Sequence, residues 1–175
     1  MEKHFNEIYS EHKEFIWNIT SKYFQNKWDR EEAFQEIFVK IHRYLPAYKE
    51  NGQNYLKTWL YKIAITTSIN FFKKQKRVQM IKDVIGFNER LFFRDQQPSN
   101  ETTMRGKEES VDYLLKPLNA NQRAVIVLRE IEGLPYEEIS EIMNVNIGTV
   151  KSMLNRSKIK IREYLKKEGI CNGRD

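Results

Sequence analysis

The chain has 175 residues, of which 40% are hydrophobic and 31% charged, a composition typical of soluble globular proteins and not of disordered chains. The first residues, MEKHFNEIYSEHKEF, lack the apolar core of a signal peptide, and no stretch approaches the roughly 18 apolar residues of a membrane span. The single Cys171 excludes an intrachain disulfide and leaves a zinc or thiolate site unsupported, so we expect a cytoplasmic protein without cofactors or membrane insertion.

Positive charge is concentrated in two windows. Residues 51–82 contain seven Lys or Arg, residues 142–162 contain five, and neither window contains an acid. Because the positive charge of these two windows together is larger than the net charge of +6 of the whole chain, the rest of the chain is net negative. Two basic surfaces favour a polyanion held at two places, and two solvated helix faces are the alternative.

The N-terminal half is expected to be helical. Only 7 Gly and 4 Pro punctuate a chain rich in helix formers, which favours an all-α fold. Apolar residues recur with a period of about 3.6 from Phe5 to Phe24, which predicts a first helix there. Asp29 followed by Glu32 is typical of a capping box that opens a second helix, and Pro46 ends it.

After a turn at KENGQN, a third helix is expected from about Tyr55 to Lys74. Beyond it, Gly86, the segment QQPSNETT and Gly106 interrupt any periodicity. We therefore predict a flexible linker over residues 81–107 between two small helical domains, 1–80 and 108–170. The apolar cluster LFF at 91–93 is interpreted as a short ordered turn, with transient docking on a partner as the alternative.

The C-terminal domain is predicted to begin its second helix at Asn119, which Gln122 completes as a capping pair. Gly133 would stop this helix, and Pro135 suits the first turn of a short helix ending near Met143.

The segment NVNIG is then expected to form a tight turn in which Asn146 caps a last helix that runs to about Lys167. A short helix, a tight turn and a longer helix have the layout of a helix-turn-helix. On the last helix, one stripe is apolar except for a serine, and another is polar and basic. The first comprises Val150, Leu154, Ser157, Ile161 and Leu165, and the second Lys151, Asn155, Lys158, Arg162 and Lys166. A recognition helix needs this arrangement, although an ordinary amphipathic helix has it too.

The segment LNANQRAVIVLREIEGLPYEEISEIMNVNIGTVKSMLNRSKIKIREYL resembles the C-terminal, -35-reading domain of extracytoplasmic-function sigma factors. The segments EEAFQEIFVKIHRYLPAY and YLKTWLYKIAITTSINFFKKQKR resemble the core-binding and promoter-melting helices of that family. A helix-turn-helix alone is shared with many repressors, but both blocks in this order are far more specific.

The resemblance implies that the chain binds core RNA polymerase and directs it to two-part promoter DNA, and that an anti-sigma factor covers it. It places Glu32, Gln35 and Glu36 against the clamp of the largest polymerase subunit. Acids beside Phe34 and Phe38 would give polar specificity next to apolar area. The alternative role for Glu32 is to cap its own helix.

The third helix resembles the segment that captures the unpaired -10 strand, where basic residues follow phosphates and rings such as Tyr55 stack on bases. The positions implied are Lys57, Trp59, Tyr61, Lys62, Thr66, Asn70, Lys73, Lys74 and Arg77. Trp59 could instead belong to the core, as aromatics at helical spacing commonly do. Thr66 stands where many relatives have Asn, which leaves base selection open, and Asn70 stands where an acid is common.

The last helix matches positions that read bases or phosphates of the -35 element, and Thr149 at its start would offer its hydroxyl and backbone N–H to a phosphate. The positions are Thr149, Lys151, Ser152, Asn155, Arg156 and Lys158. Lys151 replaces the Arg of some relatives, and a lysine reads guanine with less geometric specificity.

No catalytic constellation is present in the sequence. His4, His12 and His42 are isolated, and there is no Walker loop or nucleophile motif. The acidic clusters at 29–32 and 137–141 lie at predicted helix starts, where acids favour the helix dipole. We therefore expect a non-enzymatic protein. The main alternative is a helix-turn-helix regulator whose first half serves as a sensor or dimerisation domain.

Overall fold

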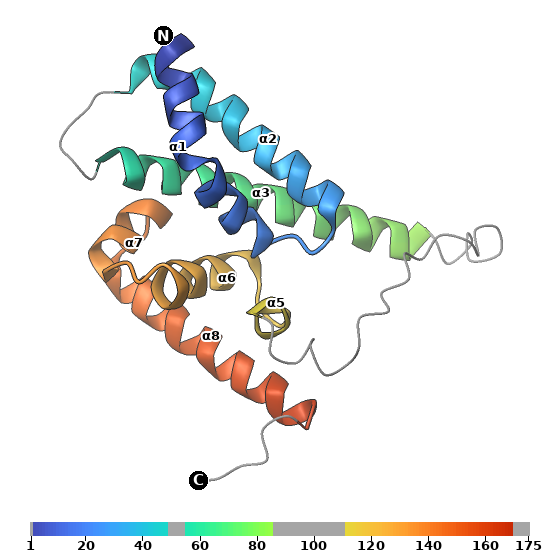
Figure 1. Ribbon diagram of the computed structural model, residues 1–175. Coiled ribbons are helices and arrows are strands. Elements are labelled where there is room, and N and C mark those ends of the chain that lie inside the picture. Colours follow the sequence, from blue (N-terminus) through green and yellow to red (C-terminus); the bar gives the residue numbers. More distant parts are fainter. Residues whose placement is uncertain (1, 49–54, 86–110, 170–175) are drawn as a thin grey trace.

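The computed structural model describes residues 2–48, 55–85 and 111–169, and every regular element in these ranges is helical, which confirms the expected all-α fold. The first group comprises α1 (Glu2–Ser21), α2 (Lys27–Tyr44), the 3-10 turn η1 (Leu45–Ala47) and α3 (Tyr55–Ile85). The second comprises α5 (Val111–Leu115), α6 (Ala120–Ile126), the π-helical turn η3 (Val127–Ile131), α7 (Tyr136–Met143) and α8 (Ile147–Lys167) (Figure 1). Within the described ranges, none of the helices is long and apolar enough to span a membrane.

The start of α2 differs from the prediction. Asn26 is the N-cap, and its side-chain oxygen accepts a hydrogen bond of 2.9 Å from the backbone N–H of Trp28. The predicted capping box of Asp29 and Glu32 is therefore wrong, because both residues already lie inside the helix. This correction also removes the capping role that was the alternative for Glu32.

The helix α3 extends to Ile85 rather than ending near Lys74, so it runs into the range expected to be linker. Residues 75–85 contain no Gly or Pro, and the first breaker of the sequence is Gly86. The sequence did not predict this extension of α3, because its charged residues interrupt the apolar period although they do not oppose helix formation. The rest of the predicted linker, the cluster at 91–93, the KENGQN turn and Cys171 lie outside the described residues.

Local signals in the second half are confirmed. The Asn119 side chain accepts from the Gln122 backbone, and the Gln122 side chain accepts from the Asn119 backbone, which is a complete capping box. Gly133 has a φ of +70°, a left-handed conformation that glycine adopts without steric cost. Asn146 caps α8, whose end at Lys167 also agrees with the prediction.

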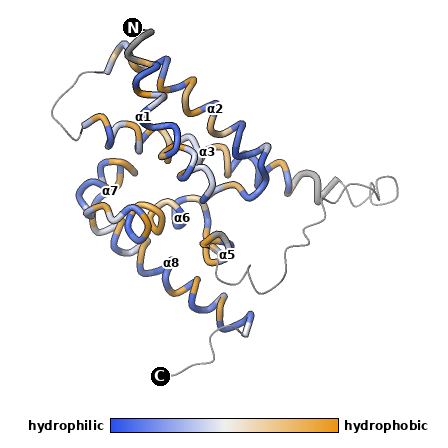
Figure 2. The backbone as a smooth tube through the Cα atoms, viewed as in Figure 1, coloured by the Kyte–Doolittle hydropathy of each residue, from blue (hydrophilic) through white to orange (hydrophobic). Residues whose placement is uncertain are grey.

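The two helical groups do not form separate thin cores. Helix α3 packs against α1 and α2 on one side and against α6 and α7 on the other (Figure 1). The helices mix hydrophobic and hydrophilic positions along their length (Figure 2), and the buried hydrophobic residues form one continuous cluster. Because short chains bury little apolar surface, each half gains core by packing on the other.

Two polar contacts join the halves. The buried guanidinium of Arg123 on α6 donates to the backbone carbonyls of Lys22 and Tyr23, which follow α1, and to that of Leu115, at 2.8 to 3.2 Å. The Tyr61 hydroxyl on α3 donates to the Glu132 carboxylate at 2.7 Å. Both contacts give hydrogen-bond partners to polar groups at the boundary between the halves.

Candidate nucleic-acid and polymerase interfaces

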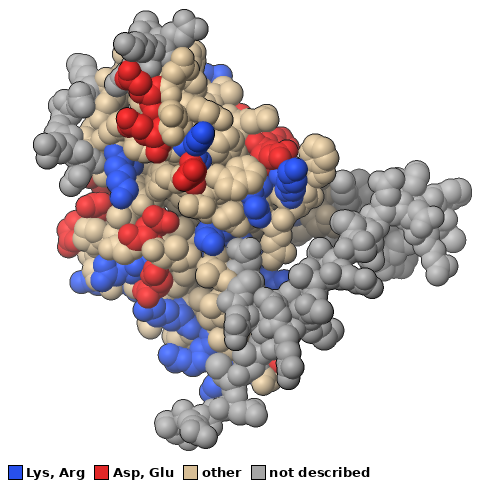
Figure 3. All heavy atoms as spheres, viewed as in Figure 1, with Lys and Arg blue, Asp and Glu red and all other residues tan. Residues whose placement is uncertain are grey.

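Helix α8 has the two faces expected of a recognition helix. Val150, Leu154 and Ser157 are buried, and the Ser157 hydroxyl donates to the Met153 carbonyl at 2.7 Å, which satisfies the one polar group in the stripe. The polar stripe, centred about 100° away around the helix, is exposed; it consists of Lys151, Asn155, Lys158, Arg162 and Lys166. In Figure 3, the surface at the lower end of the molecule, where α8 lies, shows more Lys and Arg than Asp and Glu.

Several of the predicted -35 residues already have partners. The backbone N–H and the hydroxyl of Thr149 both donate to the Asn146 side chain, at 2.7 and 2.8 Å. Lys158 pairs with Glu130 at 3.0 Å, and the Lys151 ammonium lies 5.5 Å from the centre of the Tyr136 ring. A phosphate at the start of α8 would therefore have to replace the bonds that Asn146 makes to Thr149.

The remaining -35 positions, Ser152, Asn155 and Arg156, lie on the outward side of α8. Asn155 and Arg156 are exposed, whereas Ser152 is partly buried and donates to the Thr149 carbonyl at 3.0 Å. Asn155 and Arg156 are the pair best placed to reach base edges, because long or amide side chains make such contacts in the major groove.

In its middle, where both halves pack against it, the predicted -10 helix exposes one narrow stripe. Between residues 60 and 70, only Lys62, Thr66 and Asn70 are exposed, because the two halves of the protein cover the other sides of α3. At about 100° per residue these three positions, together with Lys73 and Arg77, lie within about 80° of one another. The structure therefore brings five of the nine predicted positions onto a single polar and basic face.

Tyr61 and Lys57 lie on the opposite side of α3 from this stripe. Tyr61 is only 1% exposed, and its ring packs against Phe15 with the centroids 4.5 Å apart. Lys57 is exposed, with its ammonium 5.8 Å from the Tyr61 ring centre. Trp59 is half-buried against Tyr48 at a centroid distance of 4.8 Å, so it is partly a core residue.

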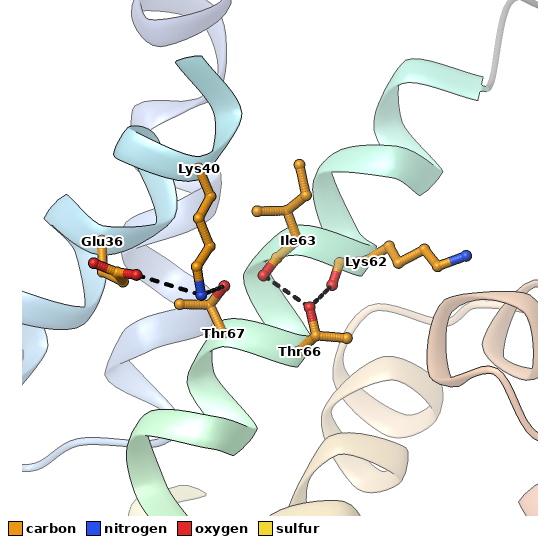
Figure 4. A network of polar contacts seen from close by, with 6 residues as sticks. All are labelled: Glu36, Lys40, Lys62, Ile63, Thr66 and Thr67. Atoms are coloured by element: carbon orange, nitrogen blue, oxygen red, sulfur yellow. Dashed lines mark hydrogen bonds and ion pairs between the residues drawn. The ribbon is translucent and has the colours of Figure 1, made fainter. Parts of the chain in front are cut away.

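The Thr66 hydroxyl donates its hydrogen bond to the backbone of its own helix. Its side-chain oxygen donates to the backbone carbonyl of Lys62 at 2.5 Å, with that of Ile63 at 3.3 Å (Figure 4). Such back-bonding is common for Thr in helices. In this state, the exposed hydroxyl oxygen is available to a base chiefly as an acceptor.

The predicted polymerase-contacting residues Glu32, Gln35 and Glu36 are all exposed on α2. Glu36 pairs with Lys40 at 3.4 Å, and Lys40 also donates to the Thr67 hydroxyl at 3.3 Å (Figure 4). Lys40 was missed in the sequence, although its spacing of four residues from Glu36 is the signal for such a pair.

A groove of about 260 Å³ lies between α2 and α3. It is lined by Glu32, Glu36, Lys40, Thr67, Asn70, Phe71 and Lys74. Lys74 thus faces the acids of α2 rather than the stripe of Lys62 and Thr66. The expected polymerase face and the expected -10 face meet at this groove. Among the described residues, no cluster of His, Cys, Asp or Glu could hold a metal ion.

Comparisons with known proteins match both halves of the chain. The family model for sigma-70 region 2 matches residues 8–78, and that for sigma-70 region 4 matches residues 108–161. The extracytoplasmic-function (ECF) RNA polymerase sigma-E factor of Haemophilus influenzae is 30% identical over 162 residues, covering 89% of this chain and 84% of the relative. The Escherichia coli K12 protein of the same name is 29% identical over 163 residues, covering 90% and 84%.

Two solved structures share the fold across both halves. One is the sigma factor RpoE of Bartonella quintana in complex with the anti-sigma factor NepR, with a TM-score of 0.63 and 21% identity over 94% of this chain and 98% of that one. The other is CnrH in complex with the cytosolic domain of CnrY, with a TM-score of 0.63 and 15% identity over 95% and 90%. The order and packing of the helices therefore resemble those of these two proteins across both halves of the chain.

Proposed function

Since this chain belongs to the extracytoplasmic-function sigma factors of the sigma-70 family, which direct RNA polymerase to promoters, we propose that its three exposed faces divide that task. The α8 face reads duplex -35 DNA, the α3 stripe holds the opened -10 strand, and α2 binds the polymerase clamp. Nucleotide chemistry belongs to the polymerase, because sigma factors are not enzymes. A stand-alone regulator does not account for the match of residues 8–78 to region 2.

The α3 stripe is the observation that supports this division most strongly. Where both halves bury α3, the exposed side chains are those that the family resemblance assigns to the -10 element. A surface with no role in packing and no acid between residues 51 and 82 is suited to a single-stranded polyanion. We accordingly assign residues 1–80 to polymerase binding and -10 melting, and residues 108–170 to -35 recognition, with residues 81–107 between them.

An Arg156→Ala substitution is expected to weaken binding of the full chain to its -35 duplex by about 1–3 kcal/mol, as for loss of one base-reading arginine. Fluorescence anisotropy with labelled duplexes, repeated with single base changes, measures both affinity and selectivity. Arg43→Ala on α2 is the control, since it removes the same charge from a distant exposed site. Unchanged selectivity in the Arg156→Ala protein would exclude Arg156 from base reading.

A Gln35→Ala/Glu36→Lys double substitution is expected to weaken association with core RNA polymerase by tenfold or more. The change removes an amide and reverses an exposed charge at the proposed interface. Transcription from a two-part promoter with purified core polymerase should fall in parallel, while binding to the isolated -35 duplex stays within twofold.

A Glu168→Lys control tests for a general charge effect, because Glu168 is exposed at the end of α8, away from α2. If the double substitution left polymerase association and transcription at the level of this control, α2 would not be the polymerase-binding face. Loss of -35 binding together with polymerase binding would instead identify a folding defect.

We extend two features of relatives to this chain. The RpoE structure is a complex with the anti-sigma factor NepR, and we propose that an anti-sigma partner covers the exposed α2 and α3 faces of this chain. The site of action is the cytoplasm, where RNA polymerase and promoter DNA are found.

A further inference from the structure

Of the three large hydrophobic side chains that α2 exposes, two, Trp28 and Val39, share one face of the helix. Trp28 is 77% exposed and Val39 is 52% exposed, while the same helix buries Ile37 and Ile41 completely. Exposed apolar residues scattered singly are ordinary. Trp28 and Val39 are not isolated in this way, because they lie on the same face of α2.

At about 100° per residue, Trp28, Glu32, Gln35 and Val39 lie within about 60° of one another on the α2 surface. This stripe is diametrically opposite Ile37, and its length from Trp28 to Val39 is about 16 Å at 1.5 Å per residue. The order along the stripe is apolar, acidic, amide and apolar. Two apolar ends therefore flank Glu32 and Gln35, the polar residues proposed to contact polymerase.

Neither apolar side chain is needed to form the helix. The N-cap of α2 is the bond from the Trp28 backbone N–H to Asn26, which does not involve the indole. Interior packing of α2 comes from Ala33, Ile37, Phe38 and Ile41 on the other side. A solvent-facing tryptophan and valine thus contribute little to the core and are accessible to a bound partner.

We propose that Trp28 and Val39 are apolar anchors of the polymerase-binding surface, one at each end of the Glu32–Gln35 segment. This inference rests on the proposed role of α2. The partner that fits is a helix of core RNA polymerase that presents aliphatic side chains about 16 Å apart, three turns of helix, with basic or amide groups between them. Tryptophan is enriched among the residues that dominate binding energies, and polar neighbours set the register.

The test compares Trp28→Ala, Val39→Ala and Tyr44→Ala in the full chain, by biolayer interferometry on immobilised core RNA polymerase. Trp28→Ala should raise the dissociation constant at least tenfold and Val39→Ala three- to tenfold. Tyr44 is the matched control, because it is 48% exposed on the same helix but lies away from the stripe. Tyr44→Ala should stay within twofold of the parent.

The Gln35→Ala/Glu36→Lys protein separates this inference from the proposed function. If it loses polymerase while Trp28→Ala and Val39→Ala stay within twofold, the anchors are wrong and the α2 face stands. If neither the double nor the single substitutions weaken binding to core RNA polymerase, α2 is not the polymerase-binding face. Thermal melting within about 2 °C of the parent, together with retained -35 binding, shows that each variant is folded.

Discussion

Replacing Arg123 with alanine is expected to lower the free energy of unfolding by about 3–5 kcal/mol, the range for breaking a buried hydrogen-bond network. The guanidinium satisfies three carbonyls drawn from both halves of the chain and lies 4.9 Å from the centre of the Phe72 ring on α3. Alanine would leave those carbonyls without their donor and open a cavity beside the ring.

Urea unfolding monitored by circular dichroism measures this loss. Arg123→Lys should fall between the parent and Arg123→Ala, since lysine keeps the charge but not the forked donor geometry. Arg162→Ala, an exposed change on α8, should lie within about 0.5 kcal/mol of the parent. A loss below about 1 kcal/mol for Arg123→Ala would mean that Arg123 does not hold the halves together.

Alkaline pH is expected to destabilise the protein through two buried tyrosines. Burial raises the pKa of Tyr23 above that of an exposed tyrosine, with the charge of Arg123 opposing the shift only in part. Burial also raises the pKa of Tyr61, with further contributions from the hydrogen bond to Glu132 and from the charges of Glu132 and Glu138. Both phenols are therefore held neutral in the folded chain.

The sign follows from proton linkage. Below pH 10, tyrosine is neutral in the folded and the unfolded chain, and the stabilisation is fully present. Above pH 10, the unfolded chain releases the proton first, so each buried tyrosine lowers the free energy of unfolding by about 1.4 kcal/mol per pH unit. The loss continues until the pH reaches the raised pKa of the folded form.

Tyr23→Phe isolates this effect. Tyr23 is 2% exposed, and its hydroxyl has no hydrogen-bond partner among the described residues, so its removal should change stability at pH 7 by less than about 1 kcal/mol. At pH 11 the variant should be about 1.4 kcal/mol less destabilised than the parent. Urea unfolding at both pH values checks this, and equal losses in parent and variant would show that Tyr23 ionises freely in the folded chain.

The sequence was sufficient where structure is set locally. The capping box of Asn119, the cap at Asn146 and the faces of α8 depend on residues a few positions apart, and all were predicted. The start of α2 was missed because Asn26 and Asp29 are both good capping residues, and the apolar pattern does not decide between them.

Contacts between the halves could not be predicted from patterns of neighbouring residues in the sequence. The burial of Tyr61 depends on Glu132, which lies 71 residues further along the chain. A tyrosine in a basic helix fits a stacking ring as well as a core residue, and only the packing of α3 between the two groups distinguishes them. The same packing narrows the predicted -10 surface to the stripe of Lys62, Thr66, Asn70, Lys73 and Arg77.

The Tyr61–Glu132 hydrogen bond would set a thermodynamic condition on any contact between Tyr61 and the -10 strand. Tyr61 cannot stack on a base while its ring is enclosed and its hydroxyl is bonded to the second half. Any use of Tyr61 by the melted strand requires the halves to part first, so the observed affinity equals the intrinsic affinity multiplied by the fraction of open molecules. An open fraction of about one in a hundred would weaken any strand contact made by Tyr61 by about 2.7 kcal/mol, whereas the stripe of Lys62, Thr66 and Asn70 is exposed in the closed form.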